Sequence, residues 1–321
     1  GCCAPKRNML KSRKPKDISL YLTGATASGK SKLALELARL LDGEIITVDS
    51  MQVYRAMDIG TDKPSPEERR RIPHHLIDIL EIHESFDAGA FIKHAQAARE
   101  EILKRGKTPI FCGGTGMYLK AWLQGLLDIP AAPVALREKL AAMSFDSLRE
   151  KLREVAPQDY EKIDIHNRRR VERALEIFLM SGEESSRKKT QWREPRNENP
   201  FCILLQRDKD SLWERIHQRV DEMFRRGLVE ETESLLQQGL EKNRTAMQAI
   251  GYRQVAAYLR GEGGSLEETI EVVKARTRQF AKRQRTWFRS QMPYARELEA
   301  AEEVRKQAQE IAEEYRIYRD Q

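Results

Sequence analysis

A glycine-rich segment near the start of the chain constrains the fold more than any other feature. Its eight residues, GATASGKS, match the pattern G-x-x-x-x-G-K-[ST] and run from Gly24 to Ser31. An apolar run precedes them at Ile18–Thr23, and a helical repeat of leucines follows at Ser31–Leu41. A strand, a glycine loop and a helix in this order are the context in which the pattern binds phosphates. We therefore predict a phosphate-binding loop at the first strand-to-helix turn.

The residue types of this loop indicate how it would hold a di- or triphosphate. Glycines at both ends let the backbone turn its amide N–H groups inward, and the helix N-terminus adds its dipole. Lys30 would neutralise phosphate charge, and the Ser31 hydroxyl is a suitable Mg²⁺ ligand. The predicted phosphate-binding residues are Gly24, Ala25, Thr26, Ala27, Ser28, Gly29, Lys30 and Ser31. Most loops of this kind serve γ-phosphoryl transfer or hydrolysis, so the loop alone names no reaction.

The order of the remaining elements predicts an α/β fold with a parallel sheet. Further strand-like runs lie at Glu44–Val48, Thr108–Cys112 and Phe201–Gln206, and a helix is expected at Ala88–Lys104. Strands that alternate with helices favour a parallel sheet covered by helices. Residues 128–200 lack a strand signal and are expected to form a helical insertion domain between core segments 17–127 and 201–321. Residues 1–16 are expected to be a disordered basic tail.

The segment after the last predicted strand is expected to be helical to its end. The predicted helices are Ser211–Arg226, Val229–Gln237, Ala246–Arg260, Leu266–Arg289 and Glu297–Tyr318. The predicted fold is thus a P-loop core with a helical insertion and a helical C-terminal part.

Charge and cysteine content bound the class of protein. The chain has 57 Lys+Arg against 50 Asp+Glu, a net charge of +7 that weakly suggests a polyanionic partner. Its four cysteines lack zinc-site spacing and fit a reducing compartment, so we expect a cytoplasmic protein. No apolar stretch approaches the roughly 20 residues that span a bilayer. No heptad seam is visible, and a monomer is expected.

Polar residues and glycines follow the second and third predicted strands. Asp49 follows Glu44–Val48, and the ligand-binding edge of a parallel sheet lies at such strand ends. It suits a general base, a magnesium-binding acid or, more plainly, a turn or helix cap. Two glycines before Thr115 would admit close approach by a ligand. The adjacent His74 and His75 point to different sides of the chain, which favours a structural or substrate-lining role over a metal site.

One predicted helix carries a stripe of positive charge. Arg278, Lys282, Arg285 and Arg289 share one helix face, and Phe280, Gln284 and Trp287 lie roughly opposite, where the aromatic rings are expected to be buried. A phosphate backbone would relieve the repulsion within this stripe, so nucleic-acid binding is favoured over a merely solvated face. A second basic cluster, Arg168–Arg170 with Arg173, lies in the predicted insertion.

Seven blocks in order resemble the tRNA dimethylallyltransferase family. They are Gly24–Ser31, Asp49–Tyr54, Pro73–Asp78, Gly113–Tyr118, Arg215–Met223, Ala249–Gln254 and Thr277–Arg289. The chain lacks a Cys/His set for the zinc finger that eukaryotic members often add, so it is similar to the bacterial type. The resemblance implies transfer of a dimethylallyl group from dimethylallyl diphosphate to tRNA. The acceptor would be the exocyclic N6 amine of the adenosine just 3′ of the anticodon.

The resemblance also implies site residues and partners. Asp49 would accept the amine proton, Thr115 would lie near the amine, and Arg219 would contact the diphosphate, with Mg²⁺ near Ser31. The anticodon stem-loop of tRNA would be the partner. The residues expected to contact it are Asp49, Ser50, Met51, Gln52, Thr115, Arg137, Arg169, Arg170, Val171, Glu172, Arg173, Gln248, Ala249, Ile250, Gly251, Tyr252 and Arg253, with Arg278, Lys282 and Arg285 of the basic helix.

Three other functions remain compatible with the loop. A P-loop nucleoside or small-molecule kinase would bind ATP there and use Asp49 as its base, but it does not need the basic helix. An RNA-binding P-loop ATPase would explain the helix and leave the pairing of Asp49 with Gly113–Gly116 unexplained. An adenylate dimethylallyltransferase would not need the insertion.

Overall fold

The computed structural model describes residues 18–125, 131–188, 199–262 and 264–321. The chain divides into two compact units, one formed by Gly1–Lys120 with Asn197–Gln321 and the other by Ala121–Arg196. The insertion predicted at 128–200 overlaps the second unit, whose boundaries lie seven and four residues earlier. The predicted tail, 1–16, lies outside the described residues.

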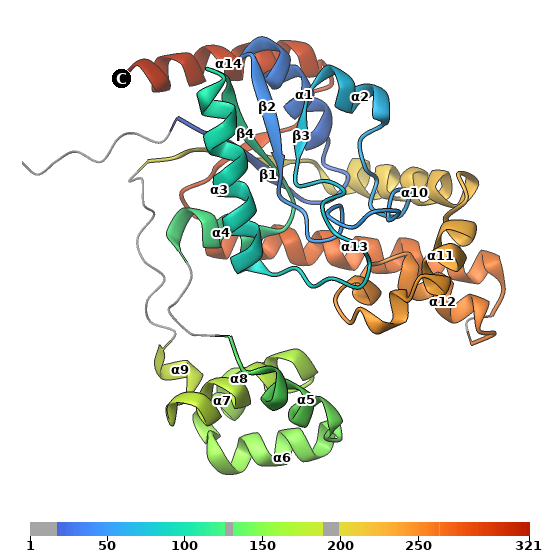
Figure 1. Ribbon diagram of the computed structural model, residues 1–321. Helices are drawn as coiled ribbons and strands as arrows, with labels where there is room; N and C mark the ends of the chain where they lie inside the picture. Colours follow the sequence, from blue (N-terminus) through green and yellow to red (C-terminus); the bar gives the residue numbers. More distant parts are fainter. Residues whose placement is uncertain (1–17, 126–130, 189–198, 263) are drawn as a thin grey trace, which may run out of the picture. The chain divides into compact units, whose positions relative to one another are not determined.

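The first unit is built on a six-stranded sheet. Its strands are β1 (Leu20–Gly24), β2 (Gly43–Thr47), β3 (His74–His75), β4 (Thr108–Gly113), β5 (Phe201–Gln206) and β6 (Arg296–Glu299). They lie in the order β3-β2-β4-β1-β5-β6, and every neighbouring pair is parallel (Figure 1). The carboxyl ends of β1, β2 and β4 therefore meet at one edge, where the glycine loop and Asp49 begin.

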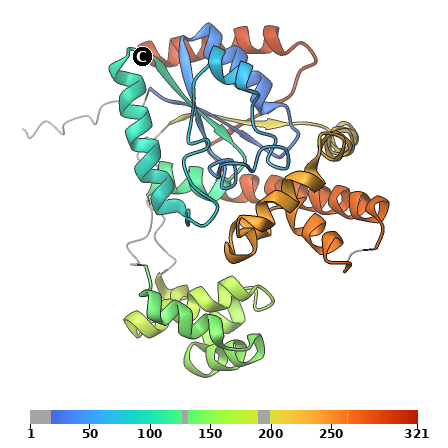
Figure 2. The same ribbon diagram turned by 45° about the vertical axis from the view of Figure 1, so that its right-hand side comes forward.

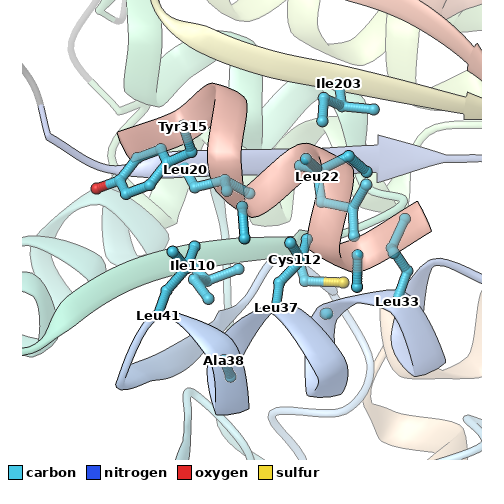
Figure 3. Packing of buried hydrophobic residues seen from close by; sticks show 14 of the residues in the cluster. Leu20, Leu22, Leu33, Leu37, Ala38, Leu41, Ile110, Cys112, Ile203 and Tyr315 are labelled. Carbon is cyan, nitrogen blue, oxygen red and sulfur yellow. The ribbon is translucent and has the colours of Figure 1, made fainter. Parts of the chain in front are cut away.

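Helices cover both faces of this sheet. Helices α1 (Lys30–Leu40) and α14 (Val304–Asp320) pack on one face, where Leu20, Leu22 and Tyr315 join one buried cluster (Figure 3). Helix α3 (Ala88–Lys104) contacts β2 and β4 from the other face. Because the central strands are buried on both faces, they read as continuous apolar runs rather than alternating ones.

A layer of helices lies beyond the carboxyl ends of the strands (Figure 2). It contains α10 (Lys209–Arg225), α11 (Leu228–Gln237), α12 (Tyr252–Leu259) and α13 (Leu266–Gln291). Short 3₁₀ turns at Leu240–Lys242 and Ala246–Gln248 separate α11 from α12. The shorter helix α2 (Pro66–Arg71) precedes β3, and the shorter helix α4 (Gly116–Gln124) follows β4. An apolar cluster joins α10 and α13 to Ala25 of the glycine loop, so this layer supports the loop directly.

The second unit is a small helical bundle with its own core. It contains α5 (Val134–Ala142), α6 (Phe145–Val155), α7 (Pro157–Lys162), α8 (Arg168–Ser181) and α9 (Ser185–Lys188). Leucines of α5, α6 and α8 form its buried cluster.

Two predicted helices are wrong at their first residues. The helix predicted at Ala246–Arg260 is interrupted at Gly251, whose φ of +95° is incompatible with a right-handed helix. The helix predicted from Glu297 begins only at Val304, because residues 296–299 pair with β5 as an edge strand. The sheet therefore does not end at Phe201–Gln206. Among the described residues, no helix is both long and apolar enough to cross a membrane.

Candidate active site

The glycine loop leads into the N-terminus of α1, where Lys30 and Ser31 line a cavity. Gly29 has a φ of +101° and precedes α1, whose first turn has no side-chain cap. The first amides of a helix without a cap are free to bind an anion. Gly24 is needed for a different reason, because a Cβ there would lie 2.6 Å from the carbonyl oxygen of Leu205.

Two cations reach the loop from its cavity side. The Lys30 ammonium donates to the Ala25 carbonyl at 3.0 Å, and burial lowers the pKa of Lys30. Arg219 of α10 donates to the Thr26 hydroxyl at 3.0 Å and lies 3.4 Å from the Asp62 carboxylate. A phosphate group in the loop would restore the favourable surroundings that a buried ammonium lacks.

Two further arginines hold the loop from behind. Arg207 donates to the Ser28 carbonyl at 3.2 Å, and Arg215 donates to the Ala27 carbonyl at 2.9 Å. Burial lowers the pKa of Arg215, and the neighbouring Arg207 and Arg219 lower it further. Four positive groups thus converge on one loop, which is an arrangement for binding a multiply charged anion.

Asp49 lies at the end of β2 with one oxygen engaged. Its Oδ1 accepts hydrogen bonds from the amides of Met51 at 2.7 Å and Gln52 at 3.0 Å. This fulfils the structural role considered for Asp49, a turn cap. Oδ2 makes no hydrogen bond within the described part of the chain, so it can accept a proton from a ligand. The Thr115 amide donates to the Val48 carbonyl at 3.2 Å, which ties Thr115 to the residue before Asp49.

Glycines let the end of β4 approach its neighbours. A Cβ on Gly113 would lie 2.0 Å from the Val48 carbonyl oxygen, and one on Gly116 would lie 2.2 Å from the Trp287 ring. Both positions exclude any side chain, so the glycine signal at this strand end reflects close packing of the protein itself.

All the predicted catalytic residues line one cavity of about 630 Å³. Its polar wall includes Thr26, Lys30, Ser31, Asp49, Gln52, Thr115, Arg219 and Gln284. Its apolar wall includes Val220, Met223, Ala249, Ile250, Val273 and Phe280. This volume suits a small-molecule ligand, and the mixed lining suits one with a charged and an apolar end.

Hydrogen bonds to Glu231 and Tyr252 hold the loop that carries Asp62. The Glu231 carboxylate accepts from the amides of Asp58 at 3.1 Å and Ile59 at 3.0 Å. The Tyr252 hydroxyl donates to Glu231 and accepts from the Gly60 amide at 3.1 Å. Tyr252 is fully buried, so its side chain does not reach RNA as predicted and instead anchors this loop.

Two of the four residues in the basic stripe of α13 are bonded to other side chains. Arg278 is hydrogen-bonded to His217, and Arg289 pairs with Glu297 at 3.2 Å. Lys282 is exposed and Arg285 half-buried, and neither has a carboxylate partner among the described residues.

The buried face of α13 differs from the predicted one. Ala281, Gln284 and Phe288 are buried, whereas Phe280 is 38% exposed and lines the cavity beside Arg283. The prediction that Phe280 is buried is therefore wrong, because the face was centred one residue too early.

The predicted RNA-contact residues of the second unit differ in exposure. Arg137, Arg169 and Arg170 are exposed, and Arg173 pairs with Glu176 at 2.9 Å. The Val171 side chain is fully buried in the core of this unit, so it cannot contact RNA as predicted. In the neighbouring cluster, the Arg168 guanidinium donates to carbonyls at the end of α5, including that of Met143 at 2.7 Å.

The sequence favoured a structural or substrate-lining role for the histidine pair; His75 is structural, and His74 also lines the cavity. His75 Nε2 lies 2.6 Å from the Glu44 carboxylate, and His74 Nδ1 lies 2.8 Å from the Ile72 carbonyl oxygen.

Burial raises the pKa of the Cys112 thiol to about 11. Within the described ranges, no group of three or more His, Cys, Asp or Glu side chains is arranged to hold a metal ion.

Four polar residues of the site were not predicted from the sequence. Arg215 carried a usable signal, because it lies one helical turn before Arg219 on the same face. Arg207 follows β5 directly and so occurs at the ligand-binding edge, which was also readable. Asp62 and Gln284 had no local signal, since their contacts bridge distant segments.

Comparison with known proteins agrees with this geometry. Residues 52–291 match the model of the family described as IPP transferase. The tRNA dimethylallyltransferase 1 of Trichlorobacter lovleyi is 45% identical over 279 residues, which cover 85% of this chain and 90% of the relative. The tRNA dimethylallyltransferase of Acetivibrio thermocellus is 42% identical over 284 residues, with 85% and 89% covered.

Solved structures give the same result. The full-length tRNA isopentenylpyrophosphate transferase of Bacillus halodurans aligns with a TM-score of 0.68 and 35% identity, covering 96% of this chain and all of that one. A eukaryotic dimethylallyltransferase acting on tRNA aligns with a TM-score of 0.72 and 29% identity, covering 88% and 74%. The sequence match, the relatives and the shared fold together identify the chain as a member of the IPP transferase family.

Proposed function

We propose that the chain is a tRNA dimethylallyltransferase. It transfers a dimethylallyl group from dimethylallyl diphosphate to the N6 amine of the adenosine 3′-adjacent to the anticodon, and it releases diphosphate. The observation that carries the proposal is one cavity in which a phosphate loop with Lys30 and Arg219 faces the free oxygen of Asp49. The names of the relatives favour this function over the P-loop kinase.

The positive end of the cavity would hold the leaving group. The amides at the N-terminus of α1, Lys30 and Arg219 bind the diphosphate, and the guanidinium of Arg219 suits bidentate phosphate binding. Negative charge on the diphosphate grows as its bond to the dimethylallyl carbon breaks. Donors fixed at that position therefore stabilise the transition state more than the ground state.

Asp49 would accept the proton that the amine releases. The N6 lone pair attacks C1 of the dimethylallyl group while the C1–oxygen bond breaks and diphosphate leaves. The amine proton then passes to the free Oδ2 of Asp49. Hydrogen bonds from Met51 and Gln52 to Oδ1 fix the carboxylate in this orientation.

Magnesium fits the polar end of the cavity. The Ser31 hydroxyl lines it and is a hard oxygen donor of the kind that Mg²⁺ prefers. The ion would take its other ligands from the diphosphate and water. When bound, it would neutralise part of the diphosphate charge.

The RNA would reach the site from surfaces bearing unpaired basic residues. On α13, the helix that lines the cavity, these include Lys282, Arg283 and Arg285. Ser50, Gln248 and Arg253 are also retained as predicted contacts, whereas Gly251 is buried. The target base must leave its stack to enter the cavity, as base-modifying enzymes require. We further propose that the enzyme is monomeric and cytoplasmic.

The test uses labelled dimethylallyl diphosphate, Mg²⁺ and unmodified tRNA, with two single variants. Asp49→Asn should lower transfer by about 100- to 10,000-fold, because the amide cannot take the proton. Asp87→Asn, at the exposed N-cap of α3, is the matched control and should behave as the wild type. A tRNA with guanosine in place of the target adenosine should accept no label. Failure of the wild type to label any tRNA, or equal rates for both variants, would refute the proposal.

A further inference from the structure

Gln284 is a buried polar side chain that joins two loops of the site. Its Oε1 accepts from the Thr26 amide at 2.9 Å, and its Nε2 donates to the Gly114 carbonyl at 3.0 Å. The residue is 8% exposed. A carboxamide is suited to this position because it carries a donor and an acceptor on one fork. We call these two hydrogen bonds the Gln284 bridge.

The bridge continues a connection that the sheet itself cannot make. Strands β1 and β4 are paired up to Thr23 and Gly113, where the Thr23 hydroxyl donates to the Gly113 carbonyl at 2.8 Å. Beyond these residues the backbones separate into the glycine loop and the Thr115 turn. Gln284 links the two again, just past the strand ends.

The two ends of the bridge belong to different halves of the reaction. Thr26 lies in the phosphate loop, and its hydroxyl accepts from Arg219 at 3.0 Å. Gly114 precedes Thr115, whose amide bonds to the residue before Asp49. The bridge therefore connects the groups that hold the diphosphate to those that face the acceptor amine.

Close packing fixes the Gln284 bridge in place. A Cβ on Gly114 would lie 2.7 Å from the Gln284 Nε2. Helix α13 also packs on α10 and Ala25 through buried apolar residues, so the backbone of Gln284 is fixed. Loss of the bridge would leave the partly buried Thr26 amide and the partly buried Gly114 carbonyl without this partner.

We propose that Gln284 is a positioning residue for prenyl transfer. By fixing the phosphate loop against the Thr115 turn, it sets the distance between the dimethylallyl carbon and the acceptor amine. This inference rests on the proposed function. Because reaction rates respond steeply to sub-ångström changes in such a distance, the effect belongs to kcat rather than to RNA binding.

The experiment compares two buried glutamines with the same hydrogen-bond pattern. Gln307 of α14 is also 8% exposed, donates to the Glu299 carbonyl at 2.7 Å and accepts from the Ala301 amide at 3.1 Å, outside the cavity. Gln284→Leu should lower kcat by about 10- to 100-fold and change the KM for tRNA by less than about threefold. Gln307→Leu should leave kcat within about twofold of the wild type, despite a similar loss of stability.

Two further measurements test the inference, and the second of them does not depend on the prenyl activity. Gln284→Glu keeps the acceptor for Thr26, removes the donor to Gly114 and adds a negative charge to the cavity wall, and it should also lower kcat. Hydrogen exchange of the Thr26 amide, followed by NMR with labelled threonine, should accelerate in Gln284→Leu and not in Gln307→Leu. Wild-type kcat in Gln284→Leu, or a rise in KM for tRNA with unchanged kcat, would overturn the inference.

A failure of the proposed function itself would look different. In that case the wild type transfers no dimethylallyl group, and the affinity for pyrophosphate decides the role of the bridge. Weaker pyrophosphate binding in Gln284→Leu than in Gln307→Leu would retain the bridge as a support of the phosphate loop. Equal affinities together with unchanged Thr26 exchange would reject it.

Discussion

A Tyr252→Phe variant tests whether Tyr252 contacts RNA or stabilises the fold. Tyr252→Phe removes only the hydroxyl that donates to Glu231 and accepts from Gly60. A buried hydrogen bond to a charged group stabilises by about 1.5–3 kcal/mol. Because Glu231 keeps its bonds to the amides of Asp58 and Ile59, we expect a loss near the middle of that range, about 2 kcal/mol.

The assay is urea unfolding followed by tryptophan fluorescence, with tRNA affinity measured in parallel. Tyr258→Phe is the matched control, since Tyr258 lies on the same helix and its hydroxyl makes no hydrogen bond within the described residues. It should cost less than about 0.5 kcal/mol. Both variants should bind tRNA within about threefold of the wild type. A tenfold loss of tRNA affinity in Tyr252→Phe with unchanged stability would refute the structural role.

Three further predictions follow from the cavity and its surroundings. Arg219→Ala should lower kcat/KM in the prenyl-transfer assay by about 100- to 1,000-fold, and Arg219→Lys by less, because a point charge replaces a fork; equal effects would contradict the bidentate role. Burial acts to raise the pKa of Asp78, but hydrogen bonds from Lys63 and Arg69 hold this pKa below the ordinary 3.8. The ionised Asp78 carboxylate therefore stabilises the fold above pH 3.8, and this contribution is lost as the pH falls through the lower pKa of the folded state. In urea unfolding at several pH values, the stability difference between wild type and Asp78→Asn should therefore shrink below about pH 4, and a constant difference would contradict this. Lys282→Ala should reduce the slope of log tRNA affinity against log salt by about one unit, whereas an unchanged slope would show that Lys282 contacts no phosphate.

The elements with strong local patterns were predictable from sequence. The helix at Ala88–Lys104 and the strand at Phe201–Gln206 have the predicted ends, because apolar periodicity and flanking breakers define both. The edge strand Arg296–Glu299 was missed because its side chains are mostly charged and exposed. Its pairing with β5 depends on backbone hydrogen bonds, which leave no apolar alternation to read.

The site was predictable where backbone geometry places it. The glycine loop, Asp49 and Thr115 were expected at one sheet edge, and all three line the same cavity. The contacts of Gln284 and Tyr252 depend on tertiary packing between segments far apart in sequence, which periodicity does not encode. Their side chains are ordinary in a helix, so nothing local distinguishes them from solvent-facing residues.

The Gln284 bridge also has a consequence for synthesis on the ribosome. Thr26 and its partner are 258 residues apart, so the loop emerges long before the side chain that fixes it. At about 5–20 residues per second, that interval is roughly 13 to 50 seconds. A nascent chain spends this time with an unfinished phosphate loop. Fragments released by a stalled ribosome before α13 would therefore lack a complete reaction centre, and prenylation begins only after α13 has been made.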